Sequence, residues 1–271
     1  MSTLSSVLKN RIAIVTGASA GIGMAIARDL AAHGSCVVLN ARRPEPLHAL
    51  AKELGESNAA VVAGDAAEVG TIHAMLDMAR SRFGAASAPG APPRDADLVI
   101  VNAGRGLNGS VMTSDVSQWE SMIRTNLLGA ALLIREAGLR MMAATAGREG
   151  PAVLDRPRDL IVIGSTVGRN VSPFSSMYGS TKFGVHGLVE GARREIGPRG
   201  VRVSLVAPGF VQSEFQGVAG YDPKWVGAMF DRIGPALVPE DVARVVTFIA
   251  SQPAGVHVND VMLRPTRQDY P

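Results

Sequence analysis

Cysteine is nearly absent from this sequence, and its histidines are scattered. Cys36 is the single cysteine among 271 residues, so an internal disulfide is excluded. Because Cys36 lies in an apolar run, we expect a buried thiol in a protein of a reducing compartment. The five histidines lack the spacing of metal ligands and are expected to be structural or surface residues. The sequence therefore predicts no metal site.

Long apolar runs and concentrated charge are also missing. No stretch approaches the roughly 18 apolar residues of a membrane-spanning helix, and residues 1–11 lack the apolar core of a targeting signal. The 27 Lys and Arg residues nearly balance 24 Asp and Glu residues, and the net charge is +3. There is no dense basic run or aromatic ladder, so we expect a cytoplasmic protein that binds neither nucleic acid nor membrane.

Glycine and apolar residues, in contrast, are plentiful. The chain contains 30 glycines and 46% hydrophobic residues, a composition typical of a compact α/β fold. Its length suits one large domain, residues 1–271, and no internal repeat is apparent beyond the alternation of strands and helices. Segments 85–97 and 145–159 are rich in Pro, Gly and Ala and are predicted to be surface insertions, too short to separate domains.

The amino-terminal pattern predicts a strand, a glycine turn, a helix and a second strand. Residues 11–16 form a β-branched run that ends in glycines, and helical spacing of apolar residues continues to about Gly34. This βαβ order predicts a Rossmann-type, doubly wound parallel sheet of about seven strands, with helices on both faces. The remaining strands are expected at 36–39, 60–63, 98–101, 160–163, 201–206 and 258–263.

The glycines of the first turn have separate physical roles in a dinucleotide site. Gly17 allows a sharp turn, Gly21 lets the backbone approach a pyrophosphate, and Gly23 permits close helix packing. The following helix N-terminus supplies N–H donors and a partial positive charge for phosphates. Tight packing alone is the alternative, but the position between strand and helix favours dinucleotide binding.

The end of the second strand distinguishes NAD from NADP. Asp or Glu at this point binds the ribose 2′-hydroxyl of NAD, whereas basic residues accommodate the 2′-phosphate of NADP. Here Arg42 and Arg43 stand without a neighbouring carboxylate, so we predict NADP(H), with two solvated loop arginines as the alternative. Asp65, at the end of the third predicted strand, would either meet the adenine amino group or cap a turn.

Tyr178 and Lys182 are candidate proton-transfer residues, because side chains four apart share one face of a helix. A phenol has a pKa of about 10, and a nearby ammonium group lowers that pKa. Such a tyrosine can exchange a proton with an alcohol or carbonyl oxygen, and Ser165 at the fifth strand end would bind the same oxygen. A Tyr-x-x-x-Lys pair alone is also typical of a solvated helix surface.

Two further features surround this pair. Asn126 falls on the apolar stripe of a helix predicted over 118–142, and a buried amide requires a partner. That partner is either structural or part of a water-linked proton path. Residues 210–238 are rich in large apolar side chains and predict either a lid over substrate or plain packing.

The ordered set of motifs resembles the short-chain dehydrogenase/reductase (SDR) family over nearly the whole chain, and the Ala-Arg-Arg run resembles that of its NADP-dependent members. The Val-Gly-Arg after Ser165 and the closing Arg-Pro-Thr-Arg-Gln resemble a branch of broad reductases acting on small aldehydes, ketones and hydroxy acids. In the family a Thr that bonds the nicotinamide carboxamide commonly stands at position 213. The matching motifs are Thr16-Gly17-Ala18-Ser19-Ala20-Gly21-Ile22-Gly23, Asn102-Ala103-Gly104, Asn126, Ser165, Tyr178, Lys182, and Pro208-Gly209 followed by Val211 and Ser213.

The resemblance implies a carbonyl reductase that passes a hydride between NADP(H) and a carbonyl or secondary alcohol of a small molecule. Tyr178 would be the general acid/base, Lys182 would lower its pKa and hold the nicotinamide ribose, Ser165 would orient the substrate oxygen, and Asn126 would link Lys182 to solvent through water. The implied cofactor-binding residues are Gly17, Ser19, Gly21, Ile22, Gly23, Arg42, Arg43, Asp65, Asn102, Ala103, Gly104, Tyr178, Lys182, Pro208, Gly209, Val211 and Ser213.

The sequence also suggests how the chain assembles and which residues line the substrate pocket. Family members are often dimers or tetramers, so we expect a homo-oligomer formed through the helices at 118–142 and 177–197. Arg169, Asn170, Val171, Met177 and the 210–238 segment are expected to line the substrate pocket. A non-catalytic NADP(H)-binding regulator, an NAD-dependent alcohol dehydrogenase of the same fold and a sugar-nucleotide epimerase are the alternative functions.

Overall fold

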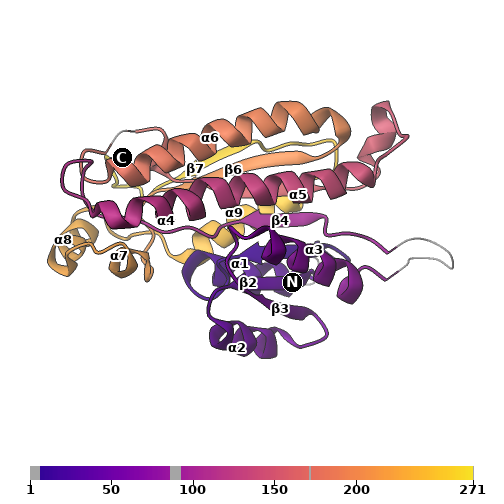
Figure 1. Ribbon diagram of the computed structural model, residues 1–271, viewed down its shortest axis with the longest axis horizontal. Coiled ribbons are helices and arrows are strands. Elements are labelled where there is room, and N and C mark those ends of the chain that lie inside the picture. Colours follow the sequence, from indigo (N-terminus) through magenta and orange to yellow (C-terminus); the bar gives the residue numbers. More distant parts are fainter. Residues whose placement is uncertain (1–6, 86–92, 171, 271) are drawn as a thin grey trace.

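The computed structural model describes residues 7–85, 93–170 and 172–270 and contains a seven-stranded sheet (Figure 1). All neighbouring strands are parallel, in the order β3-β2-β1-β4-β5-β6-β7. The strands are β1 Ile12–Thr16, β2 Cys36–Ala41, β3 Ala59–Ala63, β4 Leu98–Val101, β5 Asp159–Ile163, β6 Arg202–Pro208 and β7 Asp260–Leu263. The predicted doubly wound parallel sheet is confirmed, and its order reverses between β1 and β4, where such sheets bind ligands.

Helices cover both faces of the sheet (Figure 1). Side chains of β1 alternate between the two layers, because successive strand residues point to opposite faces. Val15 packs in the core beneath α1, α2 and α9, whereas Ile14 packs beneath α3, α5 and α6. These helices are α1 Gly21–Ala32, α2 Pro44–Leu54, α3 Val69–Phe83, α5 Gly129–Ala143, α6 Ser176–Ile196 and α9 Pro239–Ala250.

The helix predicted over 118–142 is not continuous. Asn126 lies in a π-helical turn, a rare conformation that is frequent at functional sites. Apolar periodicity does not reveal this interruption, because the apolar stripe continues through all the pieces. The pieces are a 3₁₀ turn Val116–Gln118, α4 Trp119–Ile123, the π-helical turn Arg124–Leu128 and α5 Gly129–Ala143.

Residues 210–238 contain two helices that periodicity did not predict, α7 Phe215–Val218 and α8 Pro223–Ile233. The Asp222 carboxylate caps α8 by accepting a hydrogen bond from the Lys224 N–H at 2.8 Å. Proline follows as the first helical residue, where its missing N–H costs nothing. This Asp-Pro pair is a helix start signal that the sequence contained. The role of the segment as a substrate lid stays a prediction.

The two expected insertions lie between sheet elements. Residues 86–92 of the first are outside the described part of the chain. The second connects α5 to β5 and includes a 3₁₀ helix at Gly150–Leu154. Neither interrupts the order of the strands, because the flanking strands β4 and β5 remain paired in parallel.

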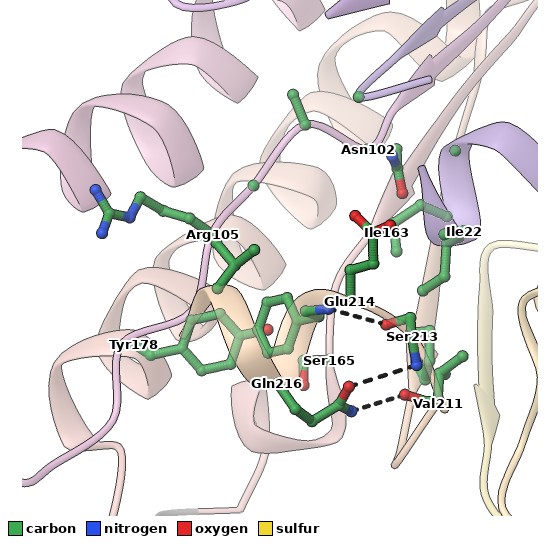
Figure 2. Close-up of a pocket in the computed structure, with 18 of the residues that line it drawn as sticks. Ile22, Asn102, Arg105, Ile163, Ser165, Tyr178, Val211, Ser213, Glu214 and Gln216 are labelled. Carbon is green, nitrogen blue, oxygen red and sulfur yellow. Dashed lines mark hydrogen bonds between the residues drawn. The ribbon is translucent and has the colours of Figure 1, made fainter. Parts of the chain in front are cut away.

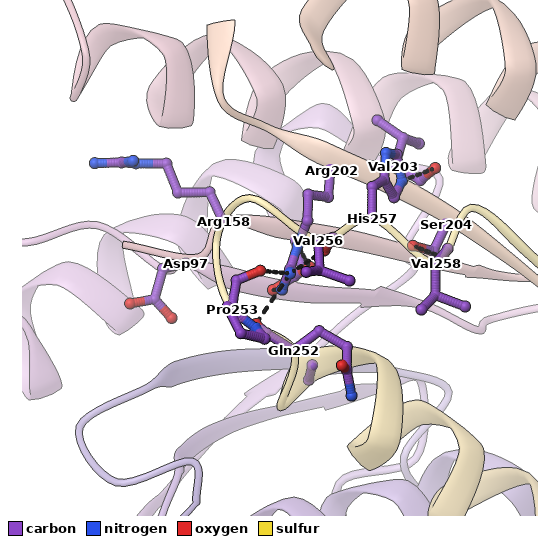
Figure 3. Close-up of polar contacts among 12 residues, drawn as sticks. Asp97, Arg158, Arg202, Val203, Ser204, Gln252, Pro253, Val256, His257 and Val258 are labelled. Carbon is purple, nitrogen blue, oxygen red and sulfur yellow. Dashed lines mark hydrogen bonds and ion pairs between the residues drawn. The ribbon is translucent and has the colours of Figure 1, made fainter. Parts of the chain in front are cut away.

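A buried ion cluster joins the amino ends of β1, β5 and β6. The Asp159 carboxylate, which is fully buried, receives hydrogen bonds from Arg11 Nη2 at 2.7 Å and from Arg202 Nε at 2.7 Å. Arg11 Nε also donates to Asp97 at 2.7 Å. Figure 3 shows Arg202 reaching the loop after α9, where its Nη1 donates to the carbonyls of Gln252, Pro253 and Val256. The cluster therefore anchors three strands and one loop at the edge opposite the ligand-binding edge.

We expect Asp159→Asn to lower the free energy of unfolding by about 3–5 kcal/mol, because it removes the carboxylate shared by two buried guanidinium groups. Urea denaturation followed by tryptophan fluorescence measures the loss. Glu53→Gln is the matched control: Glu53 pairs with Arg28 at 2.8 Å on the surface, and the expected loss is below about 1 kcal/mol. Equal losses in the two variants would contradict the structural role of the cluster.

Candidate functional site

A cleft of about 870 Å³ follows the carboxyl edge of the sheet. Its walls come from the turn after β1, the ends of β2 and β3, the turns after β4 and β5, and the segment after β6. All seventeen residues expected to bind the cofactor line it: Gly17, Ser19, Gly21, Ile22, Gly23, Arg42, Arg43, Asp65, Asn102, Ala103, Gly104, Tyr178, Lys182, Pro208, Gly209, Val211 and Ser213.

Hydrogen bonds tie the turn after β1 to the turn after β4. The Thr16 hydroxyl accepts from the N–H groups of Asn102 and Ala103, both at 3.0 Å, and Asn102 Nδ2 donates to the Thr16 carbonyl at 2.9 Å. Gly23 packs so tightly here that an added Cβ would lie 2.3 Å from the Gly17 carbonyl oxygen. Gly17 itself has φ +69°, which favours glycine. The expected role of these glycines in close packing is therefore visible in the geometry.

Two arginines and two polar side chains surround the end of the cleft beyond β2 and β3. Arg42 and Arg43 line it, and Arg43 Nη2 lies 4.0 Å from a Glu214 carboxylate oxygen with both side chains exposed. Asn40 donates to the Val62 carbonyl at 2.9 Å. Asp65 accepts from the Ala67 N–H at 2.9 Å, so it caps a turn and lines the cleft at once. Both interpretations of Asp65 are thus compatible with its position.

Ser165, Tyr178 and Lys182 meet in one wall of the cleft. Ser165 follows β5 and caps a 3₁₀ turn, whereas the other two residues project from the first turns of α6. The Lys182 Nζ donates to the Ile163 carbonyl at 2.9 Å and lies 5.9 Å from the centre of the Tyr178 ring. The helical spacing therefore places both side chains on one face, as expected.

Burial controls the protonation of this group. It raises the pKa of the Tyr178 phenol above its usual value, and a hydrogen bond with Ser165 lowers that pKa by less. Burial also lowers the pKa of Lys182 to about 8. Burial of the phenol outweighs the Ser165 hydrogen bond in setting the Tyr178 pKa. The expected lowering of that pKa by Lys182 stays a prediction.

Asn126 has structural partners. Its Oδ1 accepts from the Arg105 N–H at 2.8 Å, and its Nδ2 donates to the Arg105 carbonyl at 2.9 Å and to Thr181 Oγ1 at 3.1 Å. The buried amide thus joins the segment after β4 to α6, and it does not line the cleft. Its side chain makes no hydrogen bond to Lys182, so the water-linked proton path stays a prediction.

His186 packs behind the turn that carries Ser165 without lining the cleft, a supporting role that sequence reasoning missed. It lies one turn after Lys182, and its Nε2 accepts a hydrogen bond from the Ser165 N–H at 3.4 Å. An added Cβ on Gly164 or Gly168 would lie 2.5 Å from the imidazole, so the ring fits against the turn that carries Ser165. Burial, with the charges of Lys182 and Arg169, lowers the pKa of His186 to about 4 and keeps the ring neutral. The signal in the sequence was the helical series Tyr178, Lys182, His186.

The expected substrate-lining residues are partly wrong. Arg169 forms an ion pair with Asp260 of β7, Asn170 donates to the Thr166 carbonyl at 3.2 Å, and Met177 packs beside the apolar cluster around Met122. None of the three lines the cleft: Arg169 and Asn170 follow the 3₁₀ turn after Ser165, and Met177 lies in the first turn of α6. Val171 lies outside the described residues. Side chains of the 210–238 segment do line the cleft, as expected.

The sequence also led us to expect no membrane-spanning helix, no metal site and a buried Cys36. Within the described ranges, no helix is long and apolar enough to cross a bilayer. Across the same residues, no three His, Cys, Asp or Glu side chains are grouped as metal ligands. Cys36 is half-buried at the start of β2 rather than fully buried, because it begins the strand instead of occupying its centre.

We expect His186→Leu to lower the free energy of unfolding by about 1–3 kcal/mol, because the Ser165 N–H loses its acceptor. His186→Gln keeps an acceptor and should recover part of the loss. His48→Leu, on the exposed face of α2, is the control and should change stability by less than about 0.5 kcal/mol. Thermal denaturation of the three variants measures the effect, and an unchanged His186→Leu protein would disprove it.

Comparison with known proteins gives consistent matches. The family model for short chain dehydrogenases matches residues 11–222. An uncharacterized oxidoreductase of Staphylococcus aureus strain MW2 is 32% identical over 260 residues, covering 96% of this chain and 99% of that protein. A serine dehydrogenase solved with NADP+ has a TM-score of 0.80 at 29% identity, covering 95% of this chain and 96% of that one. A metagenomic short-chain oxidoreductase solved with NADP has a TM-score of 0.73 at 31% identity, covering 96% and 100%.

These matches extend over the same residues that carry the motifs. The matched region includes β1 to β6, the glycine turn and the wall with Ser165, Tyr178 and Lys182. The expectation of a nicotinamide-dependent oxidoreductase with a Rossmann-type fold is confirmed at this level. The chain belongs to the short-chain dehydrogenase family of oxidoreductases.

Proposed function

We propose that this protein is an NADP(H)-dependent oxidoreductase that interconverts a carbonyl group and a secondary alcohol of a small molecule, with Tyr178 as general acid/base. The observation that carries the proposal is the cleft wall in which Ser165, Tyr178 and Lys182 meet. This wall lies at the carboxyl edge of the sheet, where open α/β sheets bind their ligands.

The opposite wall fits a dinucleotide. The N-cap of α1, Ala20, makes no side-chain hydrogen bond, which leaves N–H groups of the first helical turn available for a pyrophosphate. Asn40 lines the same cleft, and its buried Oδ1 has no hydrogen-bond partner among the described residues. When bound, NADP(H) would supply or accept a hydride, that is one proton and two electrons, at the carbon of the substrate. The protein then has to orient the substrate and move one proton.

The charge at the far end of the cleft favours NADP(H) over NAD(H). Arg42 and Arg43 follow β2, and no Asp or Glu is present between Asn40 and Arg43 to bind a ribose hydroxyl. Two guanidinium groups suit the 2′-phosphate, because they form charge-assisted hydrogen bonds. The serine dehydrogenase and the metagenomic oxidoreductase were solved with NADP+ and NADP, which supports the same choice.

The protonation states support proton donation by Tyr178. Because burial raises its pKa, the phenol is neutral at physiological pH and holds the proton that a carbonyl oxygen needs on reduction. The Ser165 hydroxyl, hydrogen-bonded to the phenol, would hold the same oxygen. Lys182, with a pKa of about 8, is mostly charged at neutral pH and would stabilise the phenolate that remains. Together with the preference for NADP(H), which cells keep largely reduced, this arrangement suits carbonyl reduction, the direction that we propose.

Assembly and location stay predictions. A homodimer or homotetramer is supported by apolar side chains that α4, the π-helical turn, α5 and α6 leave exposed. These side chains are Ile123, Leu128, Leu139 and Phe183. A cytoplasmic location agrees with the single half-buried thiol.

Tyr178→Phe is expected to lower kcat for carbonyl reduction by roughly 10²- to 10⁴-fold, because the ring stays in place while the proton donor is lost. NADPH binding should change by less than about two-fold, since the phenol is not needed for phosphate recognition. NADPH oxidation measures the first effect and NADPH fluorescence the second. A fully active Tyr178→Phe protein would rule out the proposed mechanism.

Replacing Arg42 and Arg43 together by Ala is expected to raise the Kd for NADPH by at least about 100-fold, since charge-assisted hydrogen bonds contribute about 1.5–3 kcal/mol each. The Kd for NADH should stay nearly constant, because NADH lacks the 2′-phosphate. Arg135→Ala, on the exposed surface of α5, is the control. Tighter binding of NAD than NADP by the unmodified protein would overturn the cofactor assignment.

A further inference from the structure

The end of the cleft around Tyr178 is walled by large apolar side chains. They come from the stretch before α6 and from the 210–238 segment, and all of them line the cleft. The Phe215 ring centre lies 5.6 Å from that of Tyr178, so the aromatic wall begins at the proton donor itself. The other members of this wall are Phe174, Val218, Tyr221, Trp225 and Met229.

The members of this aromatic wall hold one another in place. Tyr221 and Trp225 stack with ring centres 5.5 Å apart and an interplanar angle of 17°, and Phe210 packs on Trp225 at 6.4 Å. A hydrogen bond between Tyr221 and Ser175 connects α8 and its preceding turn to the start of α6. The wall is therefore a built surface rather than a set of independent side chains.

Much of this wall faces water. Phe174 is 66% exposed, Val218 is 64% exposed and Trp225 is 40% exposed. Neighbouring apolar side chains left open to solvent at a cleft mark a binding surface, because their burial releases about 25 cal/mol per Å². An apolar group of the substrate would supply that burial.

Lys182, Arg105 and Arg232 line this end of the cleft and have partners on the protein; Lys182 Nζ, beside Tyr178, donates to the Ile163 carbonyl at 2.9 Å. Arg232 forms an ion pair with Asp269 at 3.0 Å. The terminal nitrogens of Arg105 donate to Gln118 and Ser121, and Figure 2 shows its guanidinium group pointing away from Ser165 and Ser213. The buried Arg105 Nε has no partner among the described residues, but it belongs to the same guanidinium group, which lies against Ser121 and Gln118.

The segment after β6 is also fixed relative to this wall. Gln216 Nε2 donates to the Val211 carbonyl at 2.7 Å, and its Oε1 accepts from the Ser213 N–H at 3.4 Å (Figure 2). These contacts satisfy the backbone polar groups at the base of the segment. Phe215 and Val218 lie on the segment that these contacts fix, and both line the cleft.

We propose that the substrate is an uncharged carbonyl compound with a bulky apolar group, preferably an aromatic ring, rather than a small aldehyde or a carboxylate-bearing oxo acid. The proposal rests on the proposed function and names its substrate class. The ring binds against Phe174, Val218 and Trp225 while the carbonyl oxygen faces Tyr178 and Ser165. A carboxylate at the same place would lose hydration, and the cations nearest to it, Lys182, Arg105 and Arg232, already have partners on the protein, which disfavours its binding.

Three ketones that differ in one feature each test the substrate class with NADPH and the unmodified protein. Benzylacetone carries a neutral ketone and a phenyl ring, its α-oxo acid counterpart replaces the methyl group by a carboxylate, and butanone lacks the ring. We expect kcat/KM for benzylacetone to exceed both others by at least about ten-fold, since even small changes in apolar contact alter kcat/KM by 10- to 200-fold. A higher kcat/KM for the oxo acid or for butanone would overturn the substrate class and leave the proposed function standing.

Two variants test whether the phenyl ring of benzylacetone binds against Phe174 and Trp225. Phe174→Ala and Trp225→Ala are each expected to raise KM for benzylacetone about ten-fold and to leave KM for butanone within about two-fold, because the smaller ketone does not reach the aromatic wall. Phe248→Ala is the matched control, since Phe248 lies on α9, is 55% exposed and does not line the cleft. Equal effects on both ketones, or an unchanged KM for benzylacetone in both variants, would overturn the proposal.

A binding measurement without turnover distinguishes failure of the proposed substrate class from failure of the proposed oxidoreductase mechanism. In the Tyr178→Phe protein with NADPH bound, benzylacetone should still quench tryptophan fluorescence, because Trp225 lies in the wall that binds the ring. Quenching by benzylacetone without reduction of any ketone by the unmodified protein would support the apolar site and reject the oxidoreductase mechanism. No quenching by benzylacetone together with reduction of the oxo acid would reject the substrate class alone.

Discussion

The hydrogen bonds between Thr16 and the Asn102-Ala103 turn are the constraint on which the functional edge of this protein depends. They join β1 and β4 at the point where the strand order reverses. Neighbouring parallel strands end at one edge, but the connections leave that edge in opposite directions, so a crevice opens between them. By holding the two turns together, Thr16 keeps the glycine turn against one wall of the cleft and the segment with Arg105 against the other.

Burial is the largest influence on the pKa values of the side chains at this edge. Tyr178 and Lys182 lie on one face of α6, as helical spacing requires. Their environment disfavours both charged forms, which raises the pKa of the phenol and lowers that of the amine. The same packing keeps His186 neutral against the Ser165 turn. The site thus holds an uncharged phenol beside a lysine whose pKa is lowered to about 8, which suits proton donation to a carbonyl oxygen.

The two ends of the cleft differ in chemistry because they come from different parts of the fold. The end beyond β2 carries Arg42 and Arg43 on an exposed turn, where charge remains hydrated until a phosphate binds. The end near Tyr178 is walled by the 210–238 segment, whose rings stack on one another. NADP(H), with its anionic 2′-phosphate, fits the first end, and a carbonyl substrate with an apolar group fits the second. Their reacting groups would meet at the wall that contains Ser165.

The sequence by itself determined the parallel sheet, the glycine turn and the residues that meet at its carboxyl edge. Strand and helix periodicities, glycines and the four-residue spacing of Tyr178 and Lys182 are local properties that one chain segment can encode. Only the tertiary structure decided the π-helical turn at Asn126, the contact of His186 with the Ser165 turn and the direction of the Tyr178 pKa shift. It also decided that Phe174 lines the cleft and that Arg169, which was expected there, does not. These depend on partners distant in the sequence and on burial, which no local pattern specifies.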